Sequence, residues 1–212
     1  MRTSRKAYVR GHFHFSPHWG RGYSKILRRG HAGAAWQTCP MRSLIAVAFV
    51  EPVTEGLEFP REGWPLHITL VKFDVVGPKS LPETTHRPAA GDPLAARIAS
   101  LMEPPVAEAL GSSVTVGSDA GFGRAGSVPV SLIDPSLALQ GLHDALVRIV
   151  AEVPGRIATA GHTLEGYRPH VSHLGAKRLN AGDVVVLDQI ALVDMAPDGG
   201  HATRRVLKLW TG

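Results

Sequence analysis

From residue 41 onward, short hydrophobic runs alternate with amphipathic segments and with clusters of turn-forming residues. The runs over 43–50 and 66–76 are rich in β-branched and aliphatic residues, which favours strands. The same criteria predict strands over 113–117, 127–134, 167–174, 184–194 and 203–210. The last two runs are joined through Pro197-Asp198-Gly199-Gly200, which predicts a hairpin.

Two segments have the composition and spacing of helices. Residues 93–110 are rich in Ala, Leu and Ile, and Pro104-Pro105 is expected to break or bound this helix. A second helix is expected to begin with Asp134 as N-cap and Pro135 at the first helical position. Its apolar positions share one face: Leu142, Leu146, Ile149, Val150 and Val153. Because strands and helices mix without the regular alternation of parallel-sheet folds, we expect an α+β fold with antiparallel sheet.

Charge divides the chain into two parts. The 212 residues include 23 Lys or Arg and 18 Asp or Glu. Eight of the basic residues and none of the acidic ones lie within 1–40, which leaves 15 basic against 18 acidic, a net charge of −3, in 41–212. We therefore predict a basic, disordered extension over 1–40 and one domain over 41–212. Two interpretations of the extension stay open: an arm that binds RNA, or a segment upstream of a true start at Met41.

A short pattern that occurs twice carries the candidate chemistry. His67-Ile68-Thr69 and His170-Val171-Ser172 both lie in predicted strands. Side chains at positions i and i+2 of a strand point to the same face, so each motif presents one imidazole and one hydroxyl together. The hydroxyl of Thr69 or Ser172 suits a non-bridging phosphate oxygen, and an imidazole can move a proton at a bridging oxygen or a water.

Two imidazoles meet the needs of phosphodiester cleavage, in which the nucleophile loses a proton while the leaving oxygen gains one. One neutral and one protonated histidine supply both transfers, each worth a factor of roughly 10²–10⁴. Histidine is the side chain whose ordinary pKa lets both forms coexist near neutrality. A single such motif occurs by chance in many proteins, so the repetition is the signal.

The chain resembles the two-histidine phosphoesterases, the LigT-like family of 2′-5′ RNA ligase and cyclic phosphodiesterase homologues. The resemblance lies in both motifs, including the Trp64-Pro65-Leu66 lead-in of the first and the Tyr167-Arg168-Pro169 lead-in of the second, and covers most of 41–212. It implies a bilobal fold: two pseudo-symmetric antiparallel sheets with flanking helices around a central cleft that carries both motifs. Ser172 replaces the commoner Thr and keeps the hydroxyl.

Other polar residues near the motifs are weaker candidates. Tyr167 and Arg168 are expected either to contact a base or phosphate or else to pack or lie in solvent. Arg124, in a Gly-rich turn, is a candidate to reach a phosphate from the cleft rim. His173 is expected to face away from His170 by strand alternation. The same alternation groups Lys72 with the inward Ile68 and Leu70, so we predict a strand-end surface residue there.

The composition mainly argues against certain features, namely disulfides, metal sites and membrane segments. Cys39 is the only cysteine, so neither an internal disulfide nor a cysteine-based zinc cluster is expected, and a cytoplasmic location fits best. His12, His14 and His18 form a cluster for which only adventitious metal binding is expected. We predict no cofactor, no metal and no membrane segment, a nucleotide or RNA substrate, and a monomer.

The sequence thus predicts a metal-independent phosphoesterase with His67 and His170 as catalytic residues and Thr69 and Ser172 as phosphate-binding residues. Its expected substrates are 2′,3′-cyclic phosphates of nucleotides or RNA ends, or 2′-5′ phosphodiester bonds. Three alternatives stay open: a phosphodiesterase of cyclic oligonucleotide signals, a non-catalytic RNA-binding protein that uses the basic arm and cleft, and a metal-dependent hydrolase. Product regiochemistry and the division of acid and base roles are left undetermined.

Overall fold

A computed structural model describes residues 41–76 and 92–212. The predicted extension over 1–40 lies outside these residues. The elements in chain order are β1 (Met41–Phe49), β2 (Glu58–Pro60), β3 (His67–Val76), α1 (Pro93–Ala109), β4 (Ser113–Phe122), η1 (Arg124–Gly126), β5 (Val128–Ile133), α2 (Leu137–Glu152), β6 (Gly155–Arg156), η2 (Ala160–His162), η3 (Leu164–Gly166), β7 (His170–Ser172), β8 (Val184–Val186), β9 (Gln189–Asp194), η4 (Pro197–Gly199) and β10 (Thr203–Thr211).

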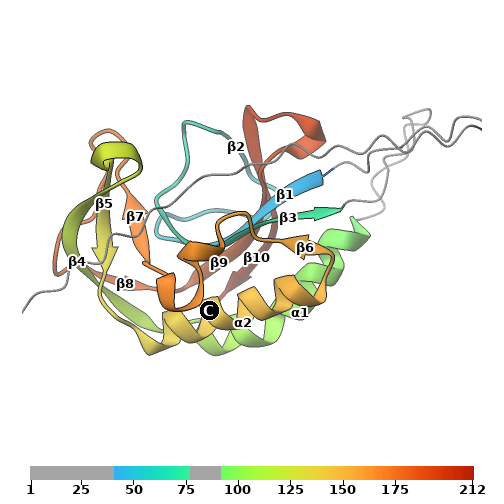
Figure 1. Cartoon of the computed structure of the whole chain (residues 1–212), viewed down its shortest axis with the longest axis horizontal. Coiled ribbons are helices and arrows are strands. Elements are labelled where there is room, and N and C mark those ends of the chain that lie inside the picture. Colours follow the sequence, from blue (N-terminus) through green and yellow to red (C-terminus); the bar gives the residue numbers. More distant parts are fainter. Residues whose placement is uncertain (1–40, 77–91) are drawn as a thin grey trace, which may run out of the picture. The chain divides into compact units, whose positions relative to one another are not determined.

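The described strands form one antiparallel sheet in the order β2-β10-β9-β1-β3-β7-β5-β4-β8, with β6 paired to β3. Figure 1 shows α1 and α2 side by side along one side of these strands. The expected α+β class with antiparallel pairing is confirmed. The two expected sheets, however, are joined edge to edge within the described chain, because Ile68 in β3 pairs with Val171 in β7.

Two hydrophobic clusters pack on opposite faces of β1, as alternation along a strand requires. Leu44, Ala46 and Ala48 belong to the larger cluster, which also holds most of the buried residues of both helices. The intervening Ile45, Val47 and Phe49 belong to a smaller cluster with residues of β9 and β10. We call the side that carries α1 and α2 the helix face of the sheet, and the other side the open face.

Helix α1 runs through the prolines that were expected to interrupt it. Asp92 accepts hydrogen bonds from the amides of Leu94 and Ala95 and so caps the N-terminus. Pro104 and Pro105 lie inside the helix. Pro104 is exposed and Pro105 half-buried, whereas the buried residues Met102 and Val106 keep the helix packed on the core. Packing of this face therefore outweighs two lost backbone hydrogen bonds.

Helix α2 starts two residues later than predicted. Ser136, rather than Asp134, is the N-cap, and its hydroxyl accepts a hydrogen bond from the Leu139 amide at 3.3 Å. The Asp134 amide instead donates to the Thr115 carbonyl and ends the β4–β5 pairing. The predicted apolar face is confirmed, since its members are all buried: Leu142, Leu146, Ile149, Val150 and Val153.

Two strand predictions need correction. The segment 184–194 divides into β8, which pairs with β4, and β9, which pairs with β1 and β10, so its two parts lie in different halves of the sheet. The segment 167–174 contributes only the three residues of β7. By contrast, β4 extends to Phe122, through residues expected to form a turn. The predicted β9–β10 hairpin is confirmed.

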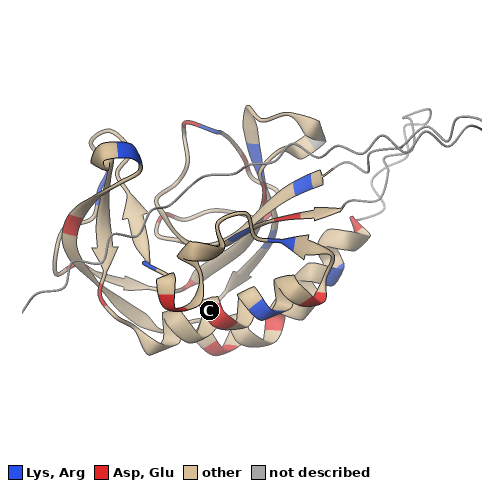
Figure 2. Cartoon of the chain, viewed as in Figure 1, with Lys and Arg blue, Asp and Glu red and all other residues tan. Residues whose placement is uncertain are grey.

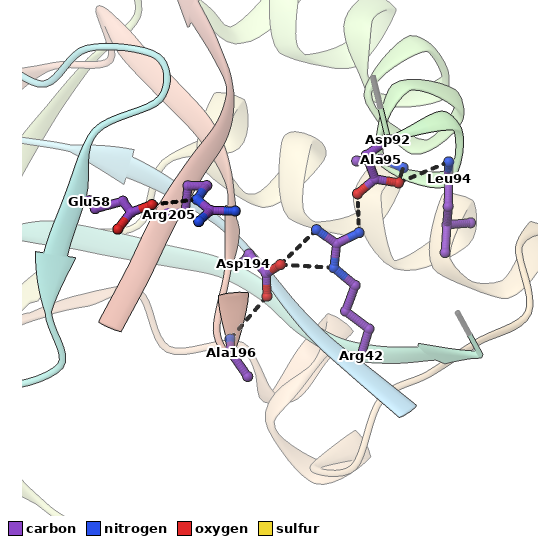
Figure 3. A network of polar contacts seen from close by, with 8 residues as sticks. All are labelled: Arg42, Glu58, Asp92, Leu94, Ala95, Asp194, Ala196 and Arg205. Atoms are coloured by element: carbon purple, nitrogen blue, oxygen red, sulfur yellow. Dashed lines mark hydrogen bonds and ion pairs between the residues drawn. The ribbon is translucent and has the colours of Figure 1, made fainter. Parts of the chain in front are cut away.

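A charged network ties β1 to β9 and to the start of α1 (Figure 3). The Arg42 guanidinium donates to Asp194 at 2.6 and 2.9 Å and also to Asp92. Burial alone would raise the pKa of Asp92, but hydrogen bonds from Arg42 and from the helix amides lower it overall. Elsewhere, charged residues of both signs are spread along the described ribbon (Figure 2). No helix in residues 41–76 and 92–212 is long and apolar enough to cross a bilayer.

Candidate active site

The two motifs lie side by side where the halves of the sheet join. Ile68 and Val171 are opposite each other and fully buried on the helix face. Continuing the antiparallel register by one residue sets His67 opposite Ser172 and Thr69 opposite His170 on the open face. Opposite residues have Cβ atoms about 4.5–5.5 Å apart and diagonal ones about 7–8 Å. The histidines therefore occupy one diagonal of a compact square, and the hydroxyls occupy the other.

Both motif histidines are anchored in the same way. His67 Nδ1 lies 2.8 Å from the Pro65 carbonyl oxygen, and His170 Nδ1 lies 2.8 Å from the Arg168 carbonyl oxygen. A carbonyl only accepts, so each Nδ1 must carry the proton that it donates. In the neutral imidazole, Nε2 is then the free base, and this backbone contact selects Nε2 as the atom that exchanges protons at both positions.

Aromatic rings pack against each imidazole. The Trp64 ring centroid lies 4.4 Å from that of His67, and Phe49 meets His67 edge-on at 6.0 Å. The Phe122 ring lies 4.6 Å from that of His170. The sequence analysis did not identify Phe122, because Gly121-Phe122-Gly123 was interpreted as a Gly-rich turn too short for a nucleotide-binding loop. An aromatic residue flanked by two glycines was the available signal.

Burial lowers the pKa of His67 below its ordinary value, and repulsion from His170 lowers it further, although the hydrogen bond to Pro65 opposes both effects. Removal of the ring from water penalises its charged form. The lowered pKa favours the neutral form of His67, whose Nε2 can accept a proton.

A β-bulge at Leu70 changes which face the rest of β3 presents. In the pairing with β1, Val47 is opposite Thr69 and the next partner, Ala46, is opposite Val71, so Leu70 has no partner. Beyond the bulge, Lys72 is opposite Ile45, whose side chain belongs to the open-face cluster. Lys72 therefore lies on the same face as His67 and Thr69. The sequence-based grouping of Lys72 with Ile68 and Leu70 was wrong, although its side chain is exposed as expected.

Two side chains hold the carbonyls of the bulge. The Tyr167 hydroxyl donates to the Thr69 carbonyl at 2.9 Å, and His143 Nδ1 lies 2.6 Å from the Leu70 carbonyl oxygen. His143 Nε2 accepts a hydrogen bond from the Leu164 amide, so the Nδ1 proton is the one donated to Leu70. The two rings stack in parallel with centroids 3.8 Å apart. Neither motif contains His143 or Tyr167, yet together they hold the backbone of the first motif.

A cavity of about 410 Å³ opens beside the motifs. Strand β3 contributes Thr69, Leu70, Val71 and Lys72 to its wall, and β7 contributes His170. Further walls come from Phe122 at the end of β4 and from the segment between β6 and η3, which supplies Ile157, Thr159, His162 and Thr163. This volume lies in the range of ligand-binding pockets.

The other candidate residues occupy varied positions, and their functional roles stay predictions. Tyr167 and Arg168 line the cavity, and the Arg168 guanidinium carbon lies 4.9 Å from the Phe122 ring centroid. Ser172 and Arg124 are exposed and do not line the cavity. His173 lies away from it, with Nε2 2.9 Å from the buried hydroxyl of Ser131.

Metal-binding candidates fall into two groups. Among residues 41–76 and 92–212, no three His, Cys, Asp or Glu side chains converge as ligands for an ion. The cluster of His12, His14 and His18 lies outside the described part of the chain.

Comparison with known proteins gives one family match. A family model described as the 2′-5′ RNA ligase superfamily matches residues 44–187. No curated protein sequence matches significantly. Similar solved structures include that of a phosphoesterase, which is 16% identical in sequence. The match covers 81% of this chain and 98% of the other, with a TM-score of 0.48. Escherichia coli LigT complexed with NADP⁺ is 16% identical; the match covers 81% of this chain and 98% of LigT, with a TM-score of 0.47. For the complex of E. coli LigT with ATP, the identity is 14%, the coverages are 82% and 98%, and the TM-score is 0.41. These scores lie below 0.5, so the assignment rests on the family model.

Proposed function

The chain belongs to the 2′-5′ RNA ligase superfamily, and from this premise we propose that it is a metal-independent phosphoesterase. Its proposed reaction is the opening of a 2′,3′-cyclic phosphate, on a nucleotide or an RNA end, to a phosphomonoester. The observation that carries the proposal is the matched anchoring of His67 and His170, each through Nδ1 to the carbonyl two residues before it. That anchoring leaves two Nε2 atoms on one face for two proton transfers.

We assign the base to His67 and the acid to His170. The lowered pKa of His67 favours the neutral form that accepts a proton. In the proposed step, a water gives one proton to His67 Nε2 while its oxygen bonds to phosphorus. The bond from phosphorus to one ribose oxygen breaks, and that oxygen takes a proton from His170 Nε2. Exchange with solvent then restores both imidazoles.

Thr69 and Ser172 are the proposed phosphate contacts. With the β3–β7 register continued by one residue, each hydroxyl lies on the open face opposite a histidine of the other motif. A hydroxyl donates one hydrogen bond, so the pair can hold two non-bridging oxygens while the imidazoles act at the bridging positions. This division uses all four motif side chains on a single phosphate.

The test is product analysis with a substrate panel. The protein is incubated with the four nucleoside 2′,3′-cyclic phosphates, 2′-5′ linked dinucleotides and a cyclic dinucleotide, each with and without a chelator. We expect chelator-resistant turnover of a cyclic phosphate. Turnover of the cyclic dinucleotide alone would indicate a phosphodiesterase of signalling nucleotides, and loss of activity with chelator would indicate a metal-dependent hydrolase.

Variants separate catalysis from binding. His67→Ala and His170→Ala are each expected to lower kcat by roughly 10²–10⁴. The matched control is His201→Ala, because His201 is an exposed histidine in the turn before β10. If the protein binds the cyclic phosphate but forms no product, and if this binding weakens steeply with salt, the result would instead support a non-catalytic RNA-binding protein.

A further inference from the structure

The position of Lys72 is set by the bulge. Thr69 and Lys72 lie on the open face opposite Val47 and Ile45, which are two residues apart in β1. Two strand residues span about 7 Å, so the backbone of Lys72 lies about 7 Å along the sheet from that of Thr69, the proposed phosphate contact. Its four-carbon stem can carry the ammonium group further still. This placement suits an anionic group separate from the one that reacts.

The charge of the cavity wall points to an anionic ligand. Lys72 and Arg168 are its charged residues other than histidine, and no Asp or Glu lines it among the described residues. The Arg168 guanidinium already lies over the Phe122 ring. The side chain of Lys72 makes no hydrogen bond or ion pair to another described residue. The ammonium of Lys72 is therefore available to a ligand.

The remaining walls suit the body of a nucleoside. Ile157 and the aromatic rings of Phe122 and Tyr167 offer apolar surface to a base. Thr159 and Thr163 offer hydroxyls that can pair with sugar or base oxygens. A ligand that reaches from Thr69 and His170 to Lys72 would pass through this space.

We propose that Lys72 binds a second phosphate of the substrate, so that the preferred substrates carry a phosphate on the 5′ side of the nucleoside whose cyclic phosphate is opened. An RNA end meets this requirement, and a bare nucleoside 2′,3′-cyclic phosphate does not. The inference rests on the proposed function, because it places the reacting phosphate at the two motifs.

Steady-state kinetics with two matched substrates test this assignment. Adenosine 2′,3′-cyclic phosphate is compared with the same compound bearing a 5′-phosphate. For the unmodified protein we expect kcat/KM to be about tenfold to a hundredfold higher with the 5′-phosphate, the range expected of one charged hydrogen bond. Lys72→Met should abolish the preference mainly through a higher KM, because a remote contact is made equally in the ground and transition states.

Two further variants complete the comparison. Lys72→Arg is expected to retain most of the preference, because it keeps the positive charge. Lys208→Met removes a lysine that pairs with Glu55 away from the cavity and should leave the preference unchanged. Equal kcat/KM for both substrates in the unmodified protein, or an equal loss on both in Lys72→Met, would overturn the inference and leave the proposed function standing.

A binding measurement keeps the two hypotheses distinguishable if neither compound is turned over. Calorimetry compares adenosine 2′,5′-bisphosphate with adenosine 2′-monophosphate, and likewise the 3′ isomers, on the unmodified protein and on Lys72→Met. If the unmodified protein binds the bisphosphates more tightly than the monophosphates and Lys72→Met loses this difference, the second phosphate site is supported. That result would hold even though the proposed hydrolysis had failed. Equal binding of mono- and bisphosphates by both proteins would overturn the site itself.

Discussion

The Tyr167 hydroxyl donates a hydrogen bond of 2.9 Å to the backbone carbonyl of Thr69. A residue that leads into the second motif therefore holds the backbone of the first. Because Thr69 immediately precedes the bulge at Leu70, this bond fixes the point at which β3 changes the face it presents. The geometry of the two motifs is thus coupled through a side chain outside both of them.

Tyr167→Phe removes this bond and keeps the ring that stacks on His143. We expect the free energy of unfolding to fall by about 1 kcal/mol, because the half-buried Thr69 carbonyl loses its partner. We also expect kcat/KM to fall at temperatures where the variant is fully folded. Trp210→Phe, which removes a bond to Glu103 away from the cavity, should lower stability without this kinetic loss. Equal kinetics in both variants would show that Tyr167 contributes to stability alone.

The environment of His67 predicts the pH dependence of turnover. A base with a lowered pKa stays neutral to lower pH, so the acid limb of kcat/KM should lie below the ordinary histidine value of 6.5. Trp64→Ala exposes the imidazole and should move this limb upward. Phe122→Ala, which uncovers His170 instead, should leave it in place. An acid limb that does not move in Trp64→Ala would contradict the base assignment.

The Asp92 network predicts a stability loss in acid. A carboxyl whose pKa is lowered by folding contributes stability above its unfolded pKa, about 3.9, and that contribution disappears as pH falls through the folded value. Asp92→Asn keeps an N-cap oxygen but loses the charge facing Arg42. We expect it to be about 0.5–1 kcal/mol less stable at pH 7. Denaturant titrations should show this difference shrinking toward zero near pH 2, and a difference independent of pH would exclude the charge as its origin.

The prolines of α1 predict a stabilising substitution. Pro104 lies inside the helix and is exposed, so Pro104→Ala restores an amide donor to the helix without opening the core. The expected gain is about 1–2 kcal/mol, after allowance for the greater freedom of the unfolded chain. Pro135→Ala, outside the first turn of α2, should give no gain in a thermal or denaturant titration. A destabilised Pro104→Ala would mean that the helix requires the proline geometry.

Local patterns predicted much of this fold. Hydrophobic periodicity and nearby turn residues predicted three of its features: the strands that contain the two motifs, the buried face of α2 and the β9–β10 hairpin. The pairing of His67 and Thr69 on one face also follows from strand geometry alone. Each of these features depends on side chains only a few residues apart.

The features that sequence missed depend on distant contacts. The bulge at Leu70 is defined by the register with β1 and held by His143 and Tyr167, so counting alternate residues along β3 misplaces Lys72. The division of 184–194 likewise reflects pairing of its two parts with β4 and β1. At α2, Asp134 was predicted as the N-cap, but its amide donates to the Thr115 carbonyl in β4 and Ser136 caps the helix instead.

The order of strands in the sheet has a consequence for synthesis on the ribosome. The neighbours of β1 are β3 and β9, and β9 is translated after both motifs, so the half of the sheet that holds His67 lacks an inner strand while the rest of the chain emerges. Domains generally fold as units during translation, and pairing between distant segments is slow. The edge of β1 that pairs with β9 therefore stays unpaired until β9 has left the exit tunnel. The half of the sheet that carries the first motif is completed only after the second motif has been translated.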